Sequence, residues 1–142
     1  MTPGFWKNHP DLWIGYATTA KFNDVFDVDI TINAGKKTEN SDPTLLEALA
    51  AEGGVNEAKH VYDALARHAV AALLNAAHSD IDYPTSTSAI ISAVHDAIAN
   101  GASVLDAAPL KDTLEGYNML GAGGAWTSCI RKLQKTILST RA

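Results

Sequence analysis

The sequence predicts a mainly α-helical fold, a compact bundle of about five helices with a short β-strand or extended insertion near residues 25–33. Alanine supplies much of the 46% hydrophobic content, and alanine has the highest intrinsic helix propensity. Apolar residues recur at spacings of three and four along most of the chain, whereas one segment alternates residue by residue. A chain of 142 residues also has the size of one domain with one hydrophobic core.

The N-terminal third predicts short elements. Thr2 can cap a helical turn that begins at Pro3, and Pro10 suits the first position of a second turn. Residues 26–32 then alternate strictly, with one apolar face made of Phe26, Val28, Ile30 and Ile32. This alternation predicts a β-strand, which could pair within the chain, pair with another chain or form an extended arm.

Three further regions predict helices. The first is expected to begin at Asp42-Pro43, and apolar spacing from Asn56 to His78 predicts the longest, central helix. Thr85 or Ser86 is expected to cap another helix, which Asn100-Gly101 would end. A short turn from Ser103 to Pro109 and a separate helix over Leu110, Leu114 and Tyr117 follow.

The predicted organisation is a single helical domain over residues 1–120, a glycine-rich linker over 121–124 and a basic amphipathic helix over 125–142. The last segment repeats apolar residues at Trp126, Ile130, Leu133 and Ile137. Residues 1–124 hold seven basic and sixteen acidic residues, a net charge of −9, whereas the final segment has four basic residues and no acid. This balance argues against nucleic acid as a partner, because phosphate binding needs a basic surface.

Cysteine content and the N-terminus give little further information. Cys129 is the single cysteine, so no intramolecular disulfide and no Cys-x-x-Cys pattern is possible. Met1-Thr2-Pro3 lacks the basic, apolar and small-residue succession of a signal peptide, and no transmembrane segment is expected.

The opening segment, residues 2–13, is the most unusual part of the chain. It concentrates aromatic, imidazole and amide side chains at a terminus, notably Trp6, Lys7, Asn8, His9 and Trp13. These groups could present a surface to a sugar or a peptide, or they could form a structural lock that plugs the bundle. Because clustered aromatic side chains are usually core, the structural interpretation is favoured.

His68 and Asn75 share the apolar stripe of the predicted central helix, next to Arg67. A buried polar pair must find hydrogen-bond partners, so these two residues are expected to hold the opening segment down. A catalytic or metal site is the alternative, although His60, His68, His78 and His95 lack ligand spacing. His78 is expected at a helix end whose dipole favours its cation.

No cofactor is expected from the sequence. Calcium is possible at Asp80 and Asp82, or among Asp24, Asp27 and Asp29, but no run matches the twelve-residue loop of an EF-hand. No catalytic residues are assigned, because no serine elbow, phosphate-binding loop or dinucleotide fingerprint occurs.

Residues 2–10, T-P-G-F-W-K-N-H-P, resemble the opening of a family of secreted or surface-anchored prokaryotic domains that begin with T-P-G-[YF]-W-K-[NT]-H-P. The similarity continues at residues 65–76, L-A-R-H-A-V-A-A-L-L-N-A, and at the D-Y-P turn of residues 82–84. A loose match to K-D-x-L-x-x-x-N covers Lys111 to Asn118. The resemblance spans residues 2–120 and implies an extracellular helical module with no assigned activity.

These observations predict a structural or interaction module, secreted or on the cell surface, that self-assembles into an oligomer or fibre. Other protein chains, above all copies of itself, are the expected partners. The residues expected in assembly contacts are Val28, Ile30, Ile32, Trp126, Ile130, Leu133 and Ile137. The alternatives are a carbohydrate- or peptide-binding module that uses the N-terminal Trp/His motif, with a surface glycan as ligand, and a metal-dependent hydrolase.

Overall fold

The computed structural model describes residues 1–35, 38–52, 62–99 and 104–119. These residues form a mainly α-helical fold with a small two-stranded antiparallel sheet, as the sequence predicted. Of the predicted elements, the linker 121–124, the helix 125–142 and the residues Asn56 to Val61 lie outside the described residues.

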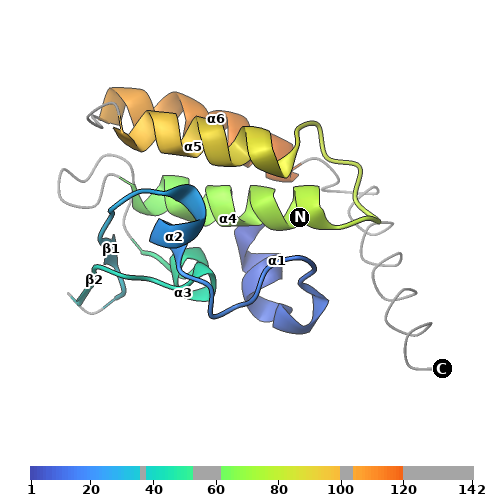
Figure 1. The fold of residues 1–142 in the computed structure, drawn as a ribbon, viewed down its shortest axis with the longest axis horizontal. Helices are drawn as coiled ribbons and strands as arrows, with labels where there is room; N and C mark the ends of the chain where they lie inside the picture. The colour runs from blue at the N-terminus through green and yellow to red at the C-terminus, as the bar shows by residue number, and fades with distance from the viewer. Residues whose placement is uncertain (36–37, 53–61, 100–103, 120–142) are drawn as a thin grey trace.

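Helix α4 (Asp63–Ala77) is the centre of the fold. Helices α5 (Thr87–Ala99) and α6 (Val104–Met119) pack on one side of it, and the short helices α1 (Pro3–Asn8) and α3 (Leu45–Leu49) pack on the other (Figure 1). With neighbours on both sides, α4 is buried on nearly all of its faces rather than along one stripe. Its many alanines allow these helices to approach closely.

The N-terminal elements begin where the sequence predicted. The Thr2 hydroxyl accepts a hydrogen bond from the Phe5 amide at 3.3 Å and caps α1. Pro10 then begins a 3₁₀ turn, Pro10–Leu12. Proline fits both starts because the first N–H groups of a helix have no partner within it.

The strand predicted for residues 26–32 is largely wrong. Helix α2 (Phe22–Phe26) contains Phe26 and ends at Asp27, which has a left-handed backbone with φ of 52°. Within this segment only Ile32 forms a strand, as part of β1 (Ile32–Asn33), which pairs with β2 (Glu39–Asn40).

A side chain takes the place of a neighbouring strand before β1. The Asn23 amide accepts a hydrogen bond from the Ile30 N–H at 3.1 Å and donates to the Ile30 and Ser41 carbonyls at 3.3 and 3.2 Å. The alternation in sequence nevertheless predicts burial, because Phe26, Ile30 and Ile32 are buried whereas Asp27 and Asp29 are exposed. The pattern therefore identified the inward side but not the hydrogen bonding.

Two helix boundaries differ from the prediction. Helix α3 is capped by Thr44, in a capping box with Glu47, and not by Asp42. Helix α6 runs through Pro109, so the predicted break between a short turn and a separate helix is wrong. Proline removes one helical hydrogen bond, and the packing of α6 against α4 and α5 offsets that cost.

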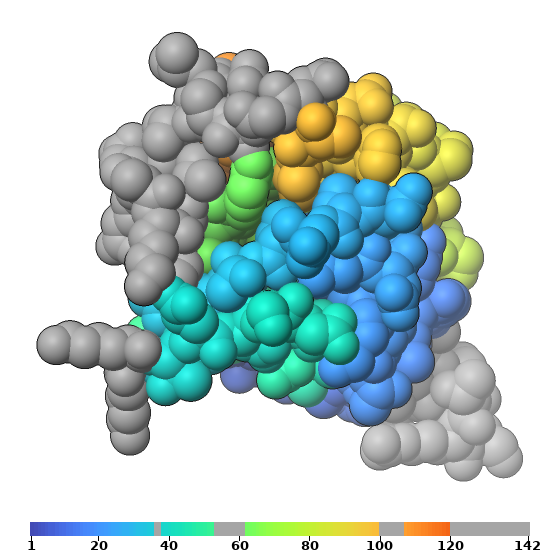
Figure 2. All heavy atoms as spheres, turned by 60° about the vertical axis from the view of Figure 1, so that its left-hand side comes forward, coloured from blue at the N-terminus to red at the C-terminus, as the bar shows by residue number. Residues whose placement is uncertain are grey.

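The segments before α4 also reach the second helical layer. Figure 2 shows residues 20–35 (blue) and 38–52 (cyan) as one continuous surface beside α5. His95 of α5 donates from Nδ1 to the carbonyl oxygens of Phe26 and Asp27, at 3.1 and 2.7 Å. None of the helices in the described ranges is long and apolar enough to cross a membrane.

Candidate functional site

Trp6 connects the opening segment to the central helix. Its side chain is fully buried, and its indole N–H donates to Asn75 Oδ1 at 3.0 Å. Phe5 meets the Trp6 ring edge-on, with centroids 5.2 Å apart. The contact expected between the opening segment and Asn75 is therefore present, and Trp6 fills the bundle rather than facing solvent.

Asn75 and Asn118 form the middle of a buried network. The Asn75 amide group donates to the Met1 carbonyl at 2.8 Å and to Asn118 Oδ1 at 3.0 Å. The same Asn118 oxygen accepts the Tyr83 hydroxyl at 2.8 Å. The Asn118 amide group in turn donates to the His68 carbonyl at 3.1 Å and to His68 Nδ1 at 3.3 Å.

We call Trp6, His68, Asn75, Tyr83 and Asn118 the polar cluster. Each amide oxygen in it accepts and each amide nitrogen donates, so both asparagines have hydrogen bonds at both ends of the amide. Buried polar groups that are fully bonded stabilise one arrangement of the segments that carry them. This pattern is typical of a structural lock.

The electrostatics of the polar cluster favour neutral groups. Burial, with a smaller contribution from Tyr117, raises the pKa of the Tyr83 hydroxyl. Burial lowers the pKa of His68, although the Glu115 carboxylate opposes this effect. His68 bonds to Asn118 and not to the opening segment, so the partner expected for this histidine was wrong.

The rest of the opening segment is arranged around Trp6. Trp13 is partly buried and donates from its indole N–H to the Trp6 carbonyl at 3.1 Å. His9 is exposed, stacks on Phe5 with centroids 4.3 Å apart and donates from Nδ1 to the Phe5 carbonyl at 2.8 Å. Lys7 and Asn8 are exposed. The motif thus divides into an inward tryptophan and an outward histidine and lysine.

Arg67 lies apart from the polar cluster. Its guanidinium donates to the Ala51 carbonyl at 2.6 Å and so ties α4 to the chain that follows α3. Lys111 of α6 contacts Asp112 at 2.7 Å and Glu115 at 2.9 Å.

The candidate metal ligands do not converge in the part of the chain that the structure describes. No group of three histidine, cysteine, aspartate or glutamate side chains there could hold a metal ion. Asp82 is exposed, and the Asp80 amide donates to His78 Nδ1 at 3.2 Å. His60 and Cys129 lie outside the described residues.

His78 corrects another expectation. It caps the C-terminal end of α4, where the helix dipole would favour a cation. Its side chain is buried, however, and burial lowers its pKa although Asp80 has the opposite effect. His78 thus lies at the helix end as expected, but desolvation lowers its pKa more than the Asp80 carboxylate raises it.

The residues expected in assembly contacts lie partly in the core and partly outside the described residues. Ile30 and Ile32 are buried in the chain's own core and Val28 is partly buried, so an open strand face built on Ile30 and Ile32 is wrong. Trp126, Ile130, Leu133 and Ile137 lie outside the described residues.

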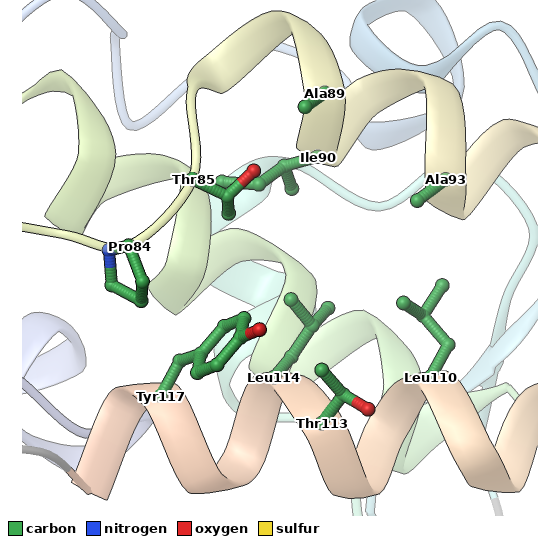
Figure 3. A pocket seen from close by; sticks show the side chains of 9 residues that line it. All are labelled: Pro84, Thr85, Ala89, Ile90, Ala93, Leu110, Thr113, Leu114 and Tyr117. Carbon is green, nitrogen blue, oxygen red and sulfur yellow. The ribbon is translucent and has the colours of Figure 1, made fainter.

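A groove opens between α5 and α6, with a volume of about 280 Å³. Figure 3 shows Leu110, Leu114 and Tyr117 of α6 directed toward α5, with Pro84 near one end. Nine residues line this groove: Pro84, Thr85, Ala89, Ile90, Ala93, Leu110, Thr113, Leu114 and Tyr117. None of them was singled out in sequence as a binding residue, because small and apolar side chains at helical spacing are typical of core.

The sequence did not single out Tyr83 or Asn118 of the polar cluster, nor the Met1 carbonyl that bonds to Asn75. The loose match at Lys111 to Asn118 was the one signal for Asn118, and nothing in the sequence indicated the Met1 carbonyl as an acceptor. Comparisons with protein families, with characterised proteins and with solved structures gave no match.

Proposed function

We propose that this chain is an extracellular structural module that joins other protein chains, chiefly copies of itself, and has no catalytic role. The observation that carries the proposal is the inward direction of the polar cluster. Trp6, Asn75 and Asn118 are buried and bonded to one another. Because these residues stabilise the fold from inside, contacts with other chains would be made by the exposed surface.

The groove supports an interaction role. It is open to solvent and lined mainly by apolar side chains from two helices. Its volume of about 280 Å³ is slightly smaller than the roughly 300–1,000 Å³ that is usual for small-molecule sites. A hollow of this size and shape suits a few side chains from a protein partner.

The secreted or surface location rests on the resemblance of residues 2–10 to surface-anchored domains. Assembly at a surface brings copies together at high local concentration, which favours contacts of modest affinity.

Light scattering coupled to size-exclusion chromatography tests the assembly. We expect the mean mass to rise with protein concentration and electron microscopy to show oligomers or fibres. A mass equal to that of one chain at every concentration would refute self-assembly.

A carbohydrate- or peptide-binding role is the second candidate, because the outward part of the opening segment keeps exposed aromatic and apolar groups. His9 is exposed, Trp13 is partly buried and Ile14 is 42% exposed. Titration with glycans or peptides, followed by tryptophan fluorescence, tests this candidate. A response that Trp13→Ala abolishes would support it, and no response to any glycan or peptide would count against it.

A further inference from the structure

We propose that the groove between α5 and α6 receives the C-terminal segment, residues 126–137, of a second copy of this chain. This inference rests on the proposed function, because it names the contact through which copies would join. Each copy would then donate one segment and receive one, which gives a head-to-tail assembly that closes into a ring or extends as a fibre.

The shape of the groove fits one apolar stripe of a helix. Leu110, Leu114 and Tyr117 follow one face of α6 and lie opposite Ala89 and Ala93 of α5 (Figure 3). Small residues on one wall and larger ones on the other leave room for inserted side chains. Helix-in-groove contacts of this kind are a common mode of peptide recognition.

The C-terminal segment has the matching pattern. Trp126, Ile130, Leu133 and Ile137 are spaced by four, three and four residues, which places them on one side of a helix. A helix from Trp126 to Ile137 would be about 16 Å long, whereas α6 rises about 10 Å from Leu110 to Tyr117. The stripe therefore covers the groove with one turn to spare.

Charge favours a contact between copies. Residues 1–124 carry a net charge of −9, so two such bodies repel one another. The C-terminal segment has Arg131, Lys132, Lys135 and Arg141 and no acid. Placed between two bodies, it supplies the positive charge that their approach requires.

Exposed carboxylates stand close to the groove in sequence. Asp82 precedes Pro84 by two residues, and Asp96 follows Ala93 by three. Asp112 is next to Thr113 and contacts Lys111. Asp82 and Asp96 are thus the carboxylates best suited to the basic side of the segment.

The position of the segment makes exchange between copies feasible. Helix α6 ends at Met119, and residues 120–125 precede Trp126. Gly121, Gly123 and Gly124 have the composition of a linker that lets a segment reach a neighbour.

The test uses two variants of the full chain that each remove one side of the contact. Leu133→Asp places a charge in the apolar stripe, and Ala89→Trp fills the groove from an exposed position of α5. Ser128→Asp, on the opposite side of the segment, and Ser92→Trp, at an exposed α5 position outside the groove lining, are the matched controls. All samples contain a reductant, because Cys129 could otherwise join two chains covalently.

Light scattering measures the mass of each sample. We expect oligomers for the unaltered chain and both controls, and monomers for Leu133→Asp and for Ala89→Trp. An equimolar mixture of these two variants should give a particle of twice the monomer mass and nothing larger. The mixture retains one intact groove and one intact segment, so a single contact remains.

The outcomes separate this inference from the proposed function. A monomeric unaltered chain would refute self-assembly and with it this contact. Oligomers that persist in Leu133→Asp and Ala89→Trp would refute the contact but leave self-assembly in place. Variants that are monomeric both alone and mixed would overturn exchange of the segment between copies. Circular dichroism of each variant verifies that it is folded.

Discussion

The polar cluster and the groove share a border but have opposite properties. Tyr83 belongs to the polar cluster and Pro84 to the groove, and Asn118 and Tyr117 are divided in the same way. The rings of Tyr83 and Tyr117 meet edge-on across this border, with centroids 6.0 Å apart. The bonded polar side chains of Trp6, Asn75 and Asn118 are thus buried inside the fold, whereas small and apolar residues line the groove.

Asn75→Leu is expected to have the largest effect on the polar cluster. It removes the oxygen that accepts the Trp6 indole N–H and the amide group that donates to the Met1 carbonyl and to Asn118 Oδ1. The Trp6 indole N–H is then buried without its acceptor, and the Met1 carbonyl and Asn118 Oδ1 each lose one donor, which together costs about 3–5 kcal/mol in the free energy of unfolding. Urea denaturation measures this loss, with Thr113→Ala in the groove as a control that changes little. Equal effects of the two substitutions would erase the distinction between the regions.

Trp6→Phe separates the hydrogen bond from the volume of the ring. The phenyl ring fills part of the same buried space but leaves Asn75 Oδ1 without its donor. We expect a loss of about 2–3 kcal/mol in the free energy of unfolding, from the missing bond and the smaller ring. Trp13→Phe also removes an indole hydrogen bond but lies nearer the surface, so it should cost less. The reverse order would identify Trp13 as the main anchor.

Tyr83→Phe and Tyr117→Phe compare the two sides of the border directly. The Tyr83 hydroxyl bonds to Asn118 Oδ1, whereas the Tyr117 ring lines the groove. Loss of the Tyr83 bond should cost about 0.5–1.5 kcal/mol, since the Asn118 oxygen keeps the Asn75 amide as a donor. Thermal unfolding of both variants measures the difference. A Tyr117 variant as destabilised as the Tyr83 variant would contradict it.

Acidification should lower the free energy of unfolding by less than the substitutions in the polar cluster. Burial lowers the pKa of His68 and of His78 below the ordinary value of 6.5, so the unfolded chain takes up these protons first. Their contribution to stability is complete above about pH 6.5 and falls as the pH decreases toward the folded-state pKa. Urea midpoints between pH 8 and pH 5 measure this slope. His68→Gln should flatten the slope, and an unchanged slope would exclude His68 as a source.

Local sequence signals predicted the helices that depend on local bonds. The Thr2 cap and the Pro10 start follow from groups within four residues of each other, and Ser86 accepts the Ala89 N–H as a cap should. The strand prediction for residues 26–32 failed because any extended segment with one buried side shows the same alternation. The Ile30 N–H bonds to the Asn23 side chain, and the spacing of apolar residues does not reveal such a partner.

The polar cluster could be predicted only in part. A histidine and an asparagine on the buried side of α4 had to find partners, which correctly directed attention to Asn75 and the opening segment. The identity of the partners depends on packing between distant segments, and Asn118 lies 43 residues from Asn75. The groove could not be predicted at all, because an apolar helix face looks the same in sequence whether another helix covers it or not.

The polar cluster also bears on how the chain acquires its fold. Trp6 and Asn75 are 69 residues apart, and Asn75 and Asn118 are 43 apart, so two long loops close on one side chain. Closing such loops costs chain entropy before the bonds compensate for it, which makes these contacts late events in folding. Neither α1 nor the end of α6 can detach without breaking a bond to Asn75 or its partner. The turn between α4 and α5 is therefore no boundary at which the chain divides into independently folding halves.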